Sequence, residues 1–265
     1  MLSPSSQPLP DEFVEALASA SHRLGLFAGE ILWYQNVSST NDVAGVLAER
    51  GAPEGCVVVA NAQSAGRGRL GRSWASPPGA GLYVSAILRP KPEAPLLTIA
   101  AGVAVAEGIQ SATGLAVDLK WPNDAFVGGR KVAGILAEAN SSAAGAYVIV
   151  GFGINIMPAA YPSDVAVRAT SIEGELGRAV DRGLLLSECL ASLSGRYVDL
   201  QQGRAADVAA AWRLRAAATF GRRVQGDVGG VVLHGVAENL DDTGALLVRT
   251  AGGVARVTAG EVTWL

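Results

Sequence analysis

Apolar residues follow two different spacings along this chain, and together they predict an alternation of helices and strands. Near the N-terminus, Phe13, Leu17 and Leu24 recur at helical spacing behind a start that is rich in Ser and Pro. Ser39, followed three residues later by Asp42, forms a capping-box pattern that places Ser39 at the start of a second helix. Further helices are expected over 96–112, 184–200 and 206–217. Strands are expected at 56–60, 82–88, 117–121, 131–138 and 147–156, after a short first strand that ends with 33–34.

The spacing of the later strands predicts the fold class. Between 117 and 156 the strand-like runs are separated by loops of turn-forming residues, which is typical of an antiparallel sheet, and the helices around it make the class α+β. After Phe220-Gly221 only short strands at close spacing remain, with a tight turn at 241–244, which predicts a small β-barrel. The expected organisation is an N-terminal segment with one helix (1–30), a large domain (31–218) and a small β-domain (219–265).

Composition and charge narrow the function classes. Of the 265 residues, 49% are hydrophobic and 17% are charged, as in a compact soluble protein. Glu107 and Glu138 interrupt the two most apolar regions, so we expect no membrane span, and the N-terminus lacks a secretory signal, which favours a cytoplasmic location. A net charge of −3 and a pI near 5.5 argue against a surface devoted to nucleic acid. Cys56 and Cys189 have no metal-binding or redox spacing and are expected to be core residues.

The strongest chemical signal is the segment 66–72, where Arg67, Arg69 and Arg72 alternate with three glycines. Arginine offers fixed donors to a phosphate or carboxylate, and glycine lets backbone amides approach the same anion, so a phosphate-bearing ligand is implied. A solvated basic turn is the alternative. The glycine spacing in 66–71 also matches the dinucleotide-binding fingerprint, but two prolines at 77–78 follow where that fingerprint requires a helix, which argues against an NAD enzyme.

Three further polar positions could belong to the same site. The segment 120–124 (KWPND) reads as a strand end and a proline turn, from which Asp124 could help to hold magnesium on nucleotide phosphates, although this is also ordinary turn chemistry. Lys131 begins an apolar strand, either as an edge residue or as an active cation. Asn155 lies within an apolar strand, where a buried amide needs either a structural partner or a ligand.

Five motifs, taken in order, resemble the biotin protein ligase family. They are Ser39-Thr40-Asn41, 63–69 (QSAGRGR), 120–124 (KWPND), 131–136 (KVAGIL) and Gly151-x-Gly153-Ile154-Asn155. The resemblance covers roughly 30–265 and includes the small C-terminal β-domain. It implies a catalytic domain like that of class II aminoacyl-tRNA synthetases, with a mixed, mainly antiparallel sheet flanked by helices, followed by an SH3-like β-barrel.

The resemblance also implies roles for individual residues. The biotin-binding positions it implies are Ser39, Thr40, Asn41, Gln63, Gly66, Arg67, Gly68, Arg69, Lys131 and Gly134. The ATP-binding positions are Arg67, Arg69, Arg72, Trp74, Asn123, Asp124, Lys131 and Asn155. Lys131 matches the lysine that contacts both the biotin carboxylate and the α-phosphate, so we expect it to be catalytic together with Arg67 and Arg69. Neutral hydroxyls and amides suit the uncharged ureido group of biotin.

The implied activity is ATP-dependent biotinylation of one lysine on the biotin carboxyl carrier domain of an acyl-CoA carboxylase, an enzyme of fatty acid biosynthesis. A biotinyl-adenylate is the implied intermediate, and magnesium accompanies ATP, with Asp124 as a candidate ligand. About 30 residues precede the expected catalytic domain, too few for the DNA-binding module of some family members, so we expect neither repressor function nor nucleic-acid binding. Leu70 stands where the family often has another arginine. The alternatives are a lipoate or octanoate ligase and a non-catalytic biotin sensor.

Overall fold

The computed structural model describes residues 5–90, 94–142, 145–158, 165, 167–216, 219–228, 231–260 and 262–265. The helices are α1 (Asp11–Leu24), α2 (Thr40–Glu49), α3 (Ala94–Thr113), α5 (Ile172–Leu176), α6 (Arg182–Gln201) and α7 (Ala205–Arg215), with 3-10 turns at Gly25–Ala28 and Arg69–Gly71. The strands are β1 (Ile31–Tyr34), β2 (Val57–Ala60), β3 (Gly81–Leu88), β4 (Asp118–Lys120), β5 (Asp124–Val127), β6 (Arg130–Ser142), β7 (Gly145–Asn155), β8 (Arg223–Val228), β9 (Val231–Leu240), β10 (Leu246–Thr250), β11 (Gly253–Val257) and β12 (Val262–Trp264).

Seven strands form the main sheet, in the order β1-β2-β3-β7-β6-β5-β4. β1 and β2 are parallel, and every other neighbouring pair is antiparallel, so the expected mixed, mainly antiparallel sheet is confirmed. β6 and β7 make its longest pairing, with ten residue pairs between Ala133–Ile154 and Ser142–Gly145. Because side chains alternate between the faces of a strand, this one register decides which residues of both strands face the helices and which face the site.

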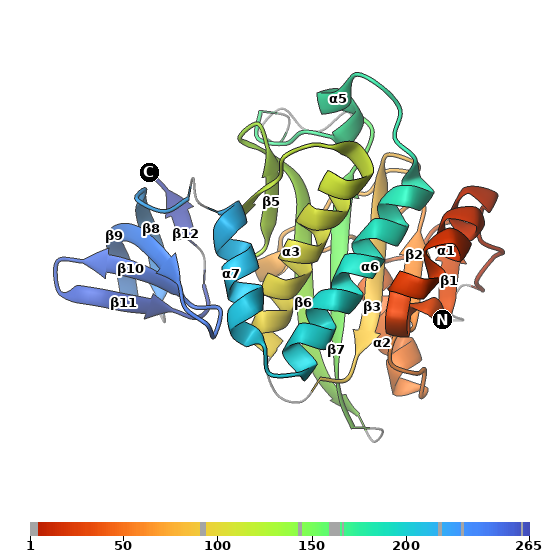
Figure 1. The fold of residues 1–265 in the computed structure, drawn as a ribbon, viewed down its shortest axis with the longest axis horizontal. Helices are drawn as coiled ribbons and strands as arrows, with labels where there is room; N and C mark the ends of the chain where they lie inside the picture. The colour runs from red at the N-terminus through yellow and green to blue at the C-terminus, as the bar shows by residue number, and fades with distance from the viewer. Residues whose placement is uncertain are drawn as a thin grey trace.

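Helices α1, α3, α6 and α7 form a layer on one face of the sheet, and α3, α6 and α7 are seen in front of it in Figure 1. This layer buries the large hydrophobic core. The window Leu96–Thr113 of α3 is long and apolar enough to cross a membrane by length and composition, but 67% of it is buried inside the protein. α3 packs along α6 and against β6, so its position at the centre of the hydrophobic core explains its apolar sequence.

The opposite face of the sheet is covered by α2. Its residues Ala44 and Ala48 pack with Val58, Ala60 and Ile149 in a second, smaller hydrophobic cluster. Small alanines on this side let the helix lie close to the strands. As a result, the N-terminal end of α2 meets the middle of β3 and β7, and this is where the site is built.

Strands β8 to β12 form a separate antiparallel sheet in the order β11-β10-β9-β8-β12, the expected SH3-like domain. It lies beyond α7, at the opposite end of the molecule from the N-terminus (Figure 1). Trp121 joins it to the main sheet by donating from Nε1 to the carbonyl of Gly244 at 3.0 Å, and Thr219 donates to the carbonyl of Leu119 at 3.2 Å. The predicted domain boundary falls at residue 218, which lies outside the described residues, so its position stays a prediction.

Three local features differ from the sequence-based expectation. The segment 120–124 is not only a turn, because Asp124 begins strand β5, which pairs with both β4 and β6. Helix α2 does begin after Ser39, but the Ser39 side chain makes no capping hydrogen bond, so the capping box is not formed. The short helix α5 was not expected, since five residues are too few to show a helical period.

Candidate active site

The floor of the site is a patch without side chains on β6 and β7. Gly134 pairs with Gly153, and Leu136 pairs with Gly151, so the three glycines lie side by side on the face opposite the helical layer. A Cβ on Gly153 would lie 2.5 Å from Nε1 of Trp74, and one on Gly134 would lie 3.1 Å from Cζ3 of the same indole. The glycines therefore make room for a flat group that lies directly on the sheet.

In this structure that group is the indole of Trp74. Its Nε1 is buried and has no hydrogen-bond partner among the residues that the structure describes. A buried donor without a partner costs about 1–3 kcal/mol, so it marks a place where an acceptor is expected. The indole has a ring face for stacking and a donor for a polar group, and its contact with the nucleotide stays a prediction.

Lys131 and Asp124 face each other at the edge of this floor. Nζ of Lys131 lies 2.6 Å from Oδ1 of Asp124 and 5.2 Å from the centre of the Trp74 ring. Oδ1 of Asp124 has no hydrogen-bond partner among the described residues, so its contact with Lys131 is an ion pair and not an aligned hydrogen bond. A register shift between Ala125 and Phe126 in β5 accompanies this approach. The expected catalytic lysine, the expected ATP-side carboxylate and Trp74 thus lie together.

A row of polar side chains from α2, β3 and the preceding loop borders the floor. Oε1 of Gln63 accepts from the backbone amide of Thr40 at 2.8 Å and lies 3.1 Å from its hydroxyl. The Ser85 hydroxyl lies 2.8 Å from Oγ1 of Thr40 and 2.6 Å from Oδ1 of Asn41. Thr40, Asn41 and Ser85 are buried. The row is a set of neutral donors and acceptors, as recognition of a ureido group requires.

The arginine loop (66–72) folds over the same region as a small hairpin. The amide of Gly68 donates to the carbonyl of Arg72 at 2.7 Å, and the amide of Trp74 donates to Gly66 at 2.8 Å. Leu70 at its tip has φ 56°, a left-handed conformation that costs a non-glycine residue about 1–2 kcal/mol. Arg69 reaches the other domain, donating to the carbonyl of Gly260 at 3.2 Å.

Arg67 points back from the loop to two carboxylates. Nη1 lies 2.5 Å from Oδ1 of Asp42, and Nη2 lies 3.3 Å from Oε2 of Glu138. Hydrogen bonding to Asp42 and the charge of Glu138 raise the pKa of Arg67, against the lowering effect of its partial burial, so it stays a cation. Direct contact of Arg67 with a substrate stays a prediction.

The two expected amides on the nucleotide side are bound to backbone groups. Nδ2 of Asn123 donates to the carbonyl of Ile135 at 2.9 Å, which fixes the start of β5 to β6. Nδ2 of Asn155 donates to the carbonyl of Thr170 at 3.0 Å, which holds the segment before α5 against the sheet. Both amides therefore have a structural role here, and their contact with ATP stays a prediction.

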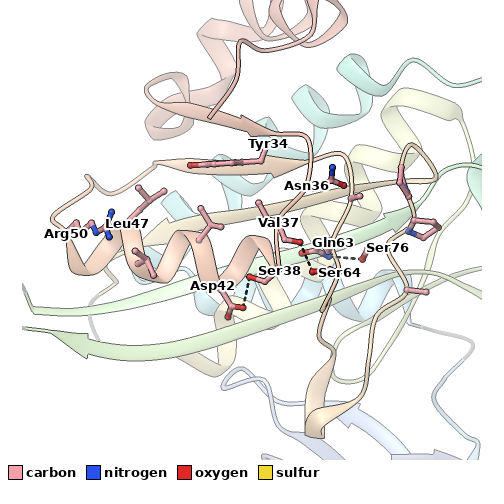
Figure 2. A pocket seen from close by; sticks show the side chains of 16 residues that line it. Tyr34, Asn36, Val37, Ser38, Asp42, Leu47, Arg50, Gln63, Ser64 and Ser76 are labelled. Carbon is pink, nitrogen blue, oxygen red and sulfur yellow. Dashed lines mark hydrogen bonds between the residues drawn. The ribbon is translucent and has the colours of Figure 1, made fainter. Parts of the chain in front are cut away.

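A cavity of about 870 Å³ lies on the other side of Gln63, between α2 and two loop segments. Figure 2 shows Arg50 and Leu47 at one end and Gln63, Ser64 and Ser76 at the other. Nε2 of Gln63 donates to Ser76 at 2.8 Å, so this side chain separates the cavity from the polar row. The cavity is lined by Tyr34, Asn36, Val37, Ser38, Asp42, Val43, Val46, Leu47, Arg50, Ala62, Gln63, Ser64, Ala75, Ser76, Pro77 and Pro78.

Four residues of this site were not expected from the sequence: Asp42, Ser76, Ser85 and Glu138. Ser85 did leave a signal, because it is the polar side chain in a buried strand, and a buried polar group needs a partner. Glu138 left a weaker one, as a charge that follows the apolar run 132–137. Asp42 was assigned to helix capping alone. Its contact with Arg67 joins residues 25 positions apart, which no local pattern reveals.

The residues present fit a nucleotide and a carboxylic acid. Lys131 and the arginine loop supply cations, and the indole of Trp74 on the glycine floor offers a planar ring for stacking. No group of three or more His, Cys, Asp or Glu side chains within the described ranges could hold a metal ion by itself. A magnesium ion carried on ATP phosphates needs only one or two protein carboxylates, and Asp124 is in place to be one of them.

Comparisons with known proteins agree with this site. Residues 33–155 match the Biotin/lipoate A/B protein ligase family, and residues 219–263 match the Biotin protein ligase C terminal domain. The chain is 35% identical over 256 residues to the bifunctional ligase/repressor BirA of Bacillus spizizenii (93% of this chain, 78% of the relative). It is 34% identical over 239 residues to the biotin--[acetyl-CoA-carboxylase] ligase of Mycobacterium tuberculosis (87% of each chain).

A solved structure shows the same fold. The biotin protein ligase of Aquifex aeolicus in complex with biotin and ATP superimposes with a TM-score of 0.79 at 29% identity, covering 89% of this chain and 99% of that chain. The sequence relatives share both domains and most of their length with this chain, and the glycine floor, Lys131 and the arginine loop lie within the matched regions. The chain therefore belongs to the biotin protein ligase family.

Proposed function

We propose that this ligase activates biotin with ATP on the glycine floor of β6 and β7 and then transfers it to one lysine of the biotin carboxyl carrier domain of an acyl-CoA carboxylase. The observation that carries the proposal is the position of Lys131, whose ammonium lies beside Asp124 and the Trp74 ring at the edge of that floor. The relative from Mycobacterium tuberculosis, named for acetyl-CoA-carboxylase, supports this choice of acceptor.

The first half-reaction brings two anions together. An oxygen of the biotin carboxylate attacks the α-phosphorus of ATP, and the bond to the β-phosphate oxygen breaks, which releases pyrophosphate. Two unit charges 4 Å apart repel by about 4 kcal/mol at an effective dielectric constant of 20. Lys131 is expected to contact both groups. Asp124 holds its ammonium in place, and a cation that is already held in place stabilises the charge of the transition state without reorganisation. Arg69 and Arg72 are the expected cations for the phosphates.

The second half-reaction consumes the mixed anhydride. The amine of the acceptor lysine attacks the biotinyl carbonyl, the bond to AMP breaks, and the amine loses a proton. Asp124 is the candidate for accepting that proton, because it is a carboxylate at the edge of the floor. The same side chain would hold magnesium with the ATP phosphates during the first half-reaction. The ion would screen phosphate charge and help pyrophosphate to leave.

The neutral polar row is the proposed binding site of the biotin ring system. Gln63 accepts from Thr40, and the amide of Asn41 is bonded to Ser85 and Glu138, so a ureido group would exchange with bonds that already exist. We propose a cytoplasmic location, where ATP and carboxylases are available. A lipoate or octanoate ligase is the rival, since the family that matches 33–155 includes both kinds of enzyme. The biotin-named relatives support biotin.

Exchange of labelled pyrophosphate into ATP tests the first half-reaction without an acceptor. We expect exchange with biotin and none with lipoate or octanoate. Lys131→Ala should lower the exchange rate by about 100-fold or more, because it removes a charge that stabilises the transition state. Arg130→Ala is the matched control, since this neighbouring cation pairs with Glu175 at 2.7 Å, and it should retain exchange. Exchange with lipoate alone, or a fully active Lys131→Ala, would contradict the proposal.

A further inference from the structure

Arg67 ties the arginine loop to two separate parts of the catalytic domain. Its guanidinium contacts Asp42 in the first turn of α2 at 2.5 Å and Glu138 in β6 at 3.3 Å. The partners are 25 and 71 residues away in sequence, so the contacts form only in the folded protein. Two of the three guanidinium nitrogens, Nη1 and Nη2, are therefore engaged by carboxylates.

Fixing Arg67 also fixes Trp74. Arg67 and Trp74 lie in opposite arms of the loop hairpin. There the backbone of Arg67 pairs with Ser73 in an isolated antiparallel β-bridge, and the amide of Trp74 donates to the carbonyl of Gly66 at 2.8 Å. If the backbone of this arm moves away from α2 and β6 with the hairpin intact, the other arm moves with it and the indole leaves Gly153.

Glu138 has a second contact that links the loop to the polar row. Its Oε2 accepts a hydrogen bond from Nδ2 of Asn41 at 2.6 Å, and Oδ1 of Asn41 lies 2.6 Å from the Ser85 hydroxyl. One carboxylate thus orients the amide of the proposed ureido site and holds the arginine of the covering loop. This accounts for the charged residue at the end of the apolar run 132–137 of β6.

We propose that Asp42 and Glu138 are positioning residues that keep the arginine loop closed, so that the biotinyl-adenylate is retained until the acceptor lysine arrives. This inference rests on the proposed function. The side chains of Arg67, Asp42 and Glu138 are 39%, 41% and 34% exposed, and ion pairs at such exposure are weak one by one. Two together favour closure but still let the loop open for an acceptor.

The test uses Asp42→Asn, Glu138→Gln and the double variant in the full-length protein. After biotin and ATP are added without acceptor, the half-life of the enzyme-bound adenylate is measured by rapid gel filtration. We expect Glu138→Gln to release it about tenfold faster, which corresponds to 1.4 kcal/mol, and to raise KM for biotin more than it lowers kcat of exchange. Asp42→Glu, which keeps the charge, should restore retention. Asp207→Asn, which removes an exposed carboxylate on α7, is the control.

A second measurement needs no substrate. Trypsin cuts after arginine, and the loop carries three, so its rate of cutting at 67, 69 and 72 reports how often the loop opens. Faster cutting in Asp42→Asn and Glu138→Gln, with unchanged circular dichroism, is expected. If both variants keep the wild-type adenylate half-life and trypsin rate, the inference is overturned. If the wild-type protein makes no adenylate, the proposed function fails, and the trypsin rates still decide whether the carboxylates hold the loop.

Should Glu138→Gln fail to fold, Asp42→Asn alone decides, because Asp42 lies on the surface of α2 and its loss leaves the sheet intact. A wild-type adenylate half-life and trypsin rate in that variant would overturn the role of Asp42.

Discussion

Trp74 is the side chain whose position depends most directly on a missing Cβ. It lies on Gly134 and Gly153, and its indole nitrogen has no acceptor among the described residues. The indole therefore covers the floor without being locked to it by a hydrogen bond. A ligand that offers an acceptor, or a ring to stack on, would gain from the same contact.

Gly153→Ala tests this contact. The new Cβ would meet Nε1 of Trp74 at 2.5 Å, so the indole must move, while the backbone conformation of Gly153 is one that alanine can adopt. We expect KM for ATP and biotin in pyrophosphate exchange to rise about tenfold, with a stability loss within the 1–3 kcal/mol usual for overpacking. Gly45→Ala on α2, which has nothing within 4 Å, should change neither. Unchanged KM values in Gly153→Ala would show that the position of the indole does not affect substrate binding.

Single residues show how far the sequence could predict the site. The types and order of Thr40, Gln63, Trp74 and Lys131 were enough to expect that they meet, and the structure brings them to one face of the sheet. The partners that hold them could not be predicted. The contact of Glu138 with Asn41, for example, joins residues 97 positions apart and depends on the register of β6 in the sheet.

Helices α3 and α6 pack closely where Gly108 meets Cys189. A Cβ on Gly108 would lie 2.5 Å from the sulfur of Cys189 and 2.7 Å from its Cα, so backbone as well as side chain would have to shift. Gly108→Ala should therefore destabilise the protein by about 1–3 kcal/mol despite the better helix propensity of alanine.

The control for that variant lies in the same helix. Gly102 has only Leu119 near the position of a new Cβ, at 3.8 Å, an ordinary contact. Gly102→Ala should stabilise by up to about 1 kcal/mol, as expected for glycine to alanine inside a helix. Urea unfolding midpoints of the two variants should move in opposite directions. Equal shifts would mean that helix propensity, and not the contact between helices, sets the result.

The turn between β9 and β10 depends on one carboxylate. Burial, the largest single effect on Asp241, would raise its pKa, but hydrogen bonds from Thr243, Arg256 and two backbone amides outweigh it and lower the pKa to about 2. A lowered pKa in the folded state means that the charged form stabilises the fold. That stability is fully present above the unfolded value near 3.8 and is lost as the pH falls through about 2.

Asp241→Asn should remove this stabilisation. At neutral pH we expect a loss of about 2 kcal/mol, since each pKa unit corresponds to 1.36 kcal/mol and the side chain is largely buried. Between pH 4 and 2 the wild-type protein should lose about this much more stability than the variant, measured by denaturant unfolding of both across that range. Asp242→Asn, at a neighbouring carboxylate that is 60% exposed, is the control and should follow the wild type.

Among the secondary-structure elements, periodicity predicted the long ones and missed the short ones. Helices α3 and α6 were predicted at 96–112 and 184–200, and the longer strands of the main sheet were predicted too. Each of these elements has enough residues to show its period. β5 was missed since its four residues begin within the Pro-Asn-Asp segment at Asp124, and only pairing with β4 and β6 makes it a strand. Tertiary contact, not local preference, decides such segments.

The relation between the two sheets could not be expected from the sequence at all. The C-terminal sheet is joined to the main one through Trp121 with Gly244, and it also receives Arg69 from the arginine loop. Lys120 lies 5.5 Å from the ring of Trp264 across the same boundary. The loop that covers the active site is thus in contact with α2, β6 and the C-terminal domain together.

The two hydrophobic cores on opposite faces of the main sheet each contain one buried thiol. Cys56 belongs to the cluster under α2, and Cys189 to the cluster under α3 and α6. Burial raises the pKa of Cys56 to about 12 and that of Cys189 further, so neither thiol reacts until its layer opens.

Because of this arrangement, the rate at which a thiol reagent labels each cysteine measures how often the layer that covers it opens. We expect Cys56 to be labelled first, since α2 is a single helix over a small cluster. We expect biotin and ATP to slow the labelling of Cys56 but not that of Cys189. Both rates can be measured by mass spectrometry of quenched samples. Equal rates at both positions would mean that the two layers come apart only when the whole protein unfolds.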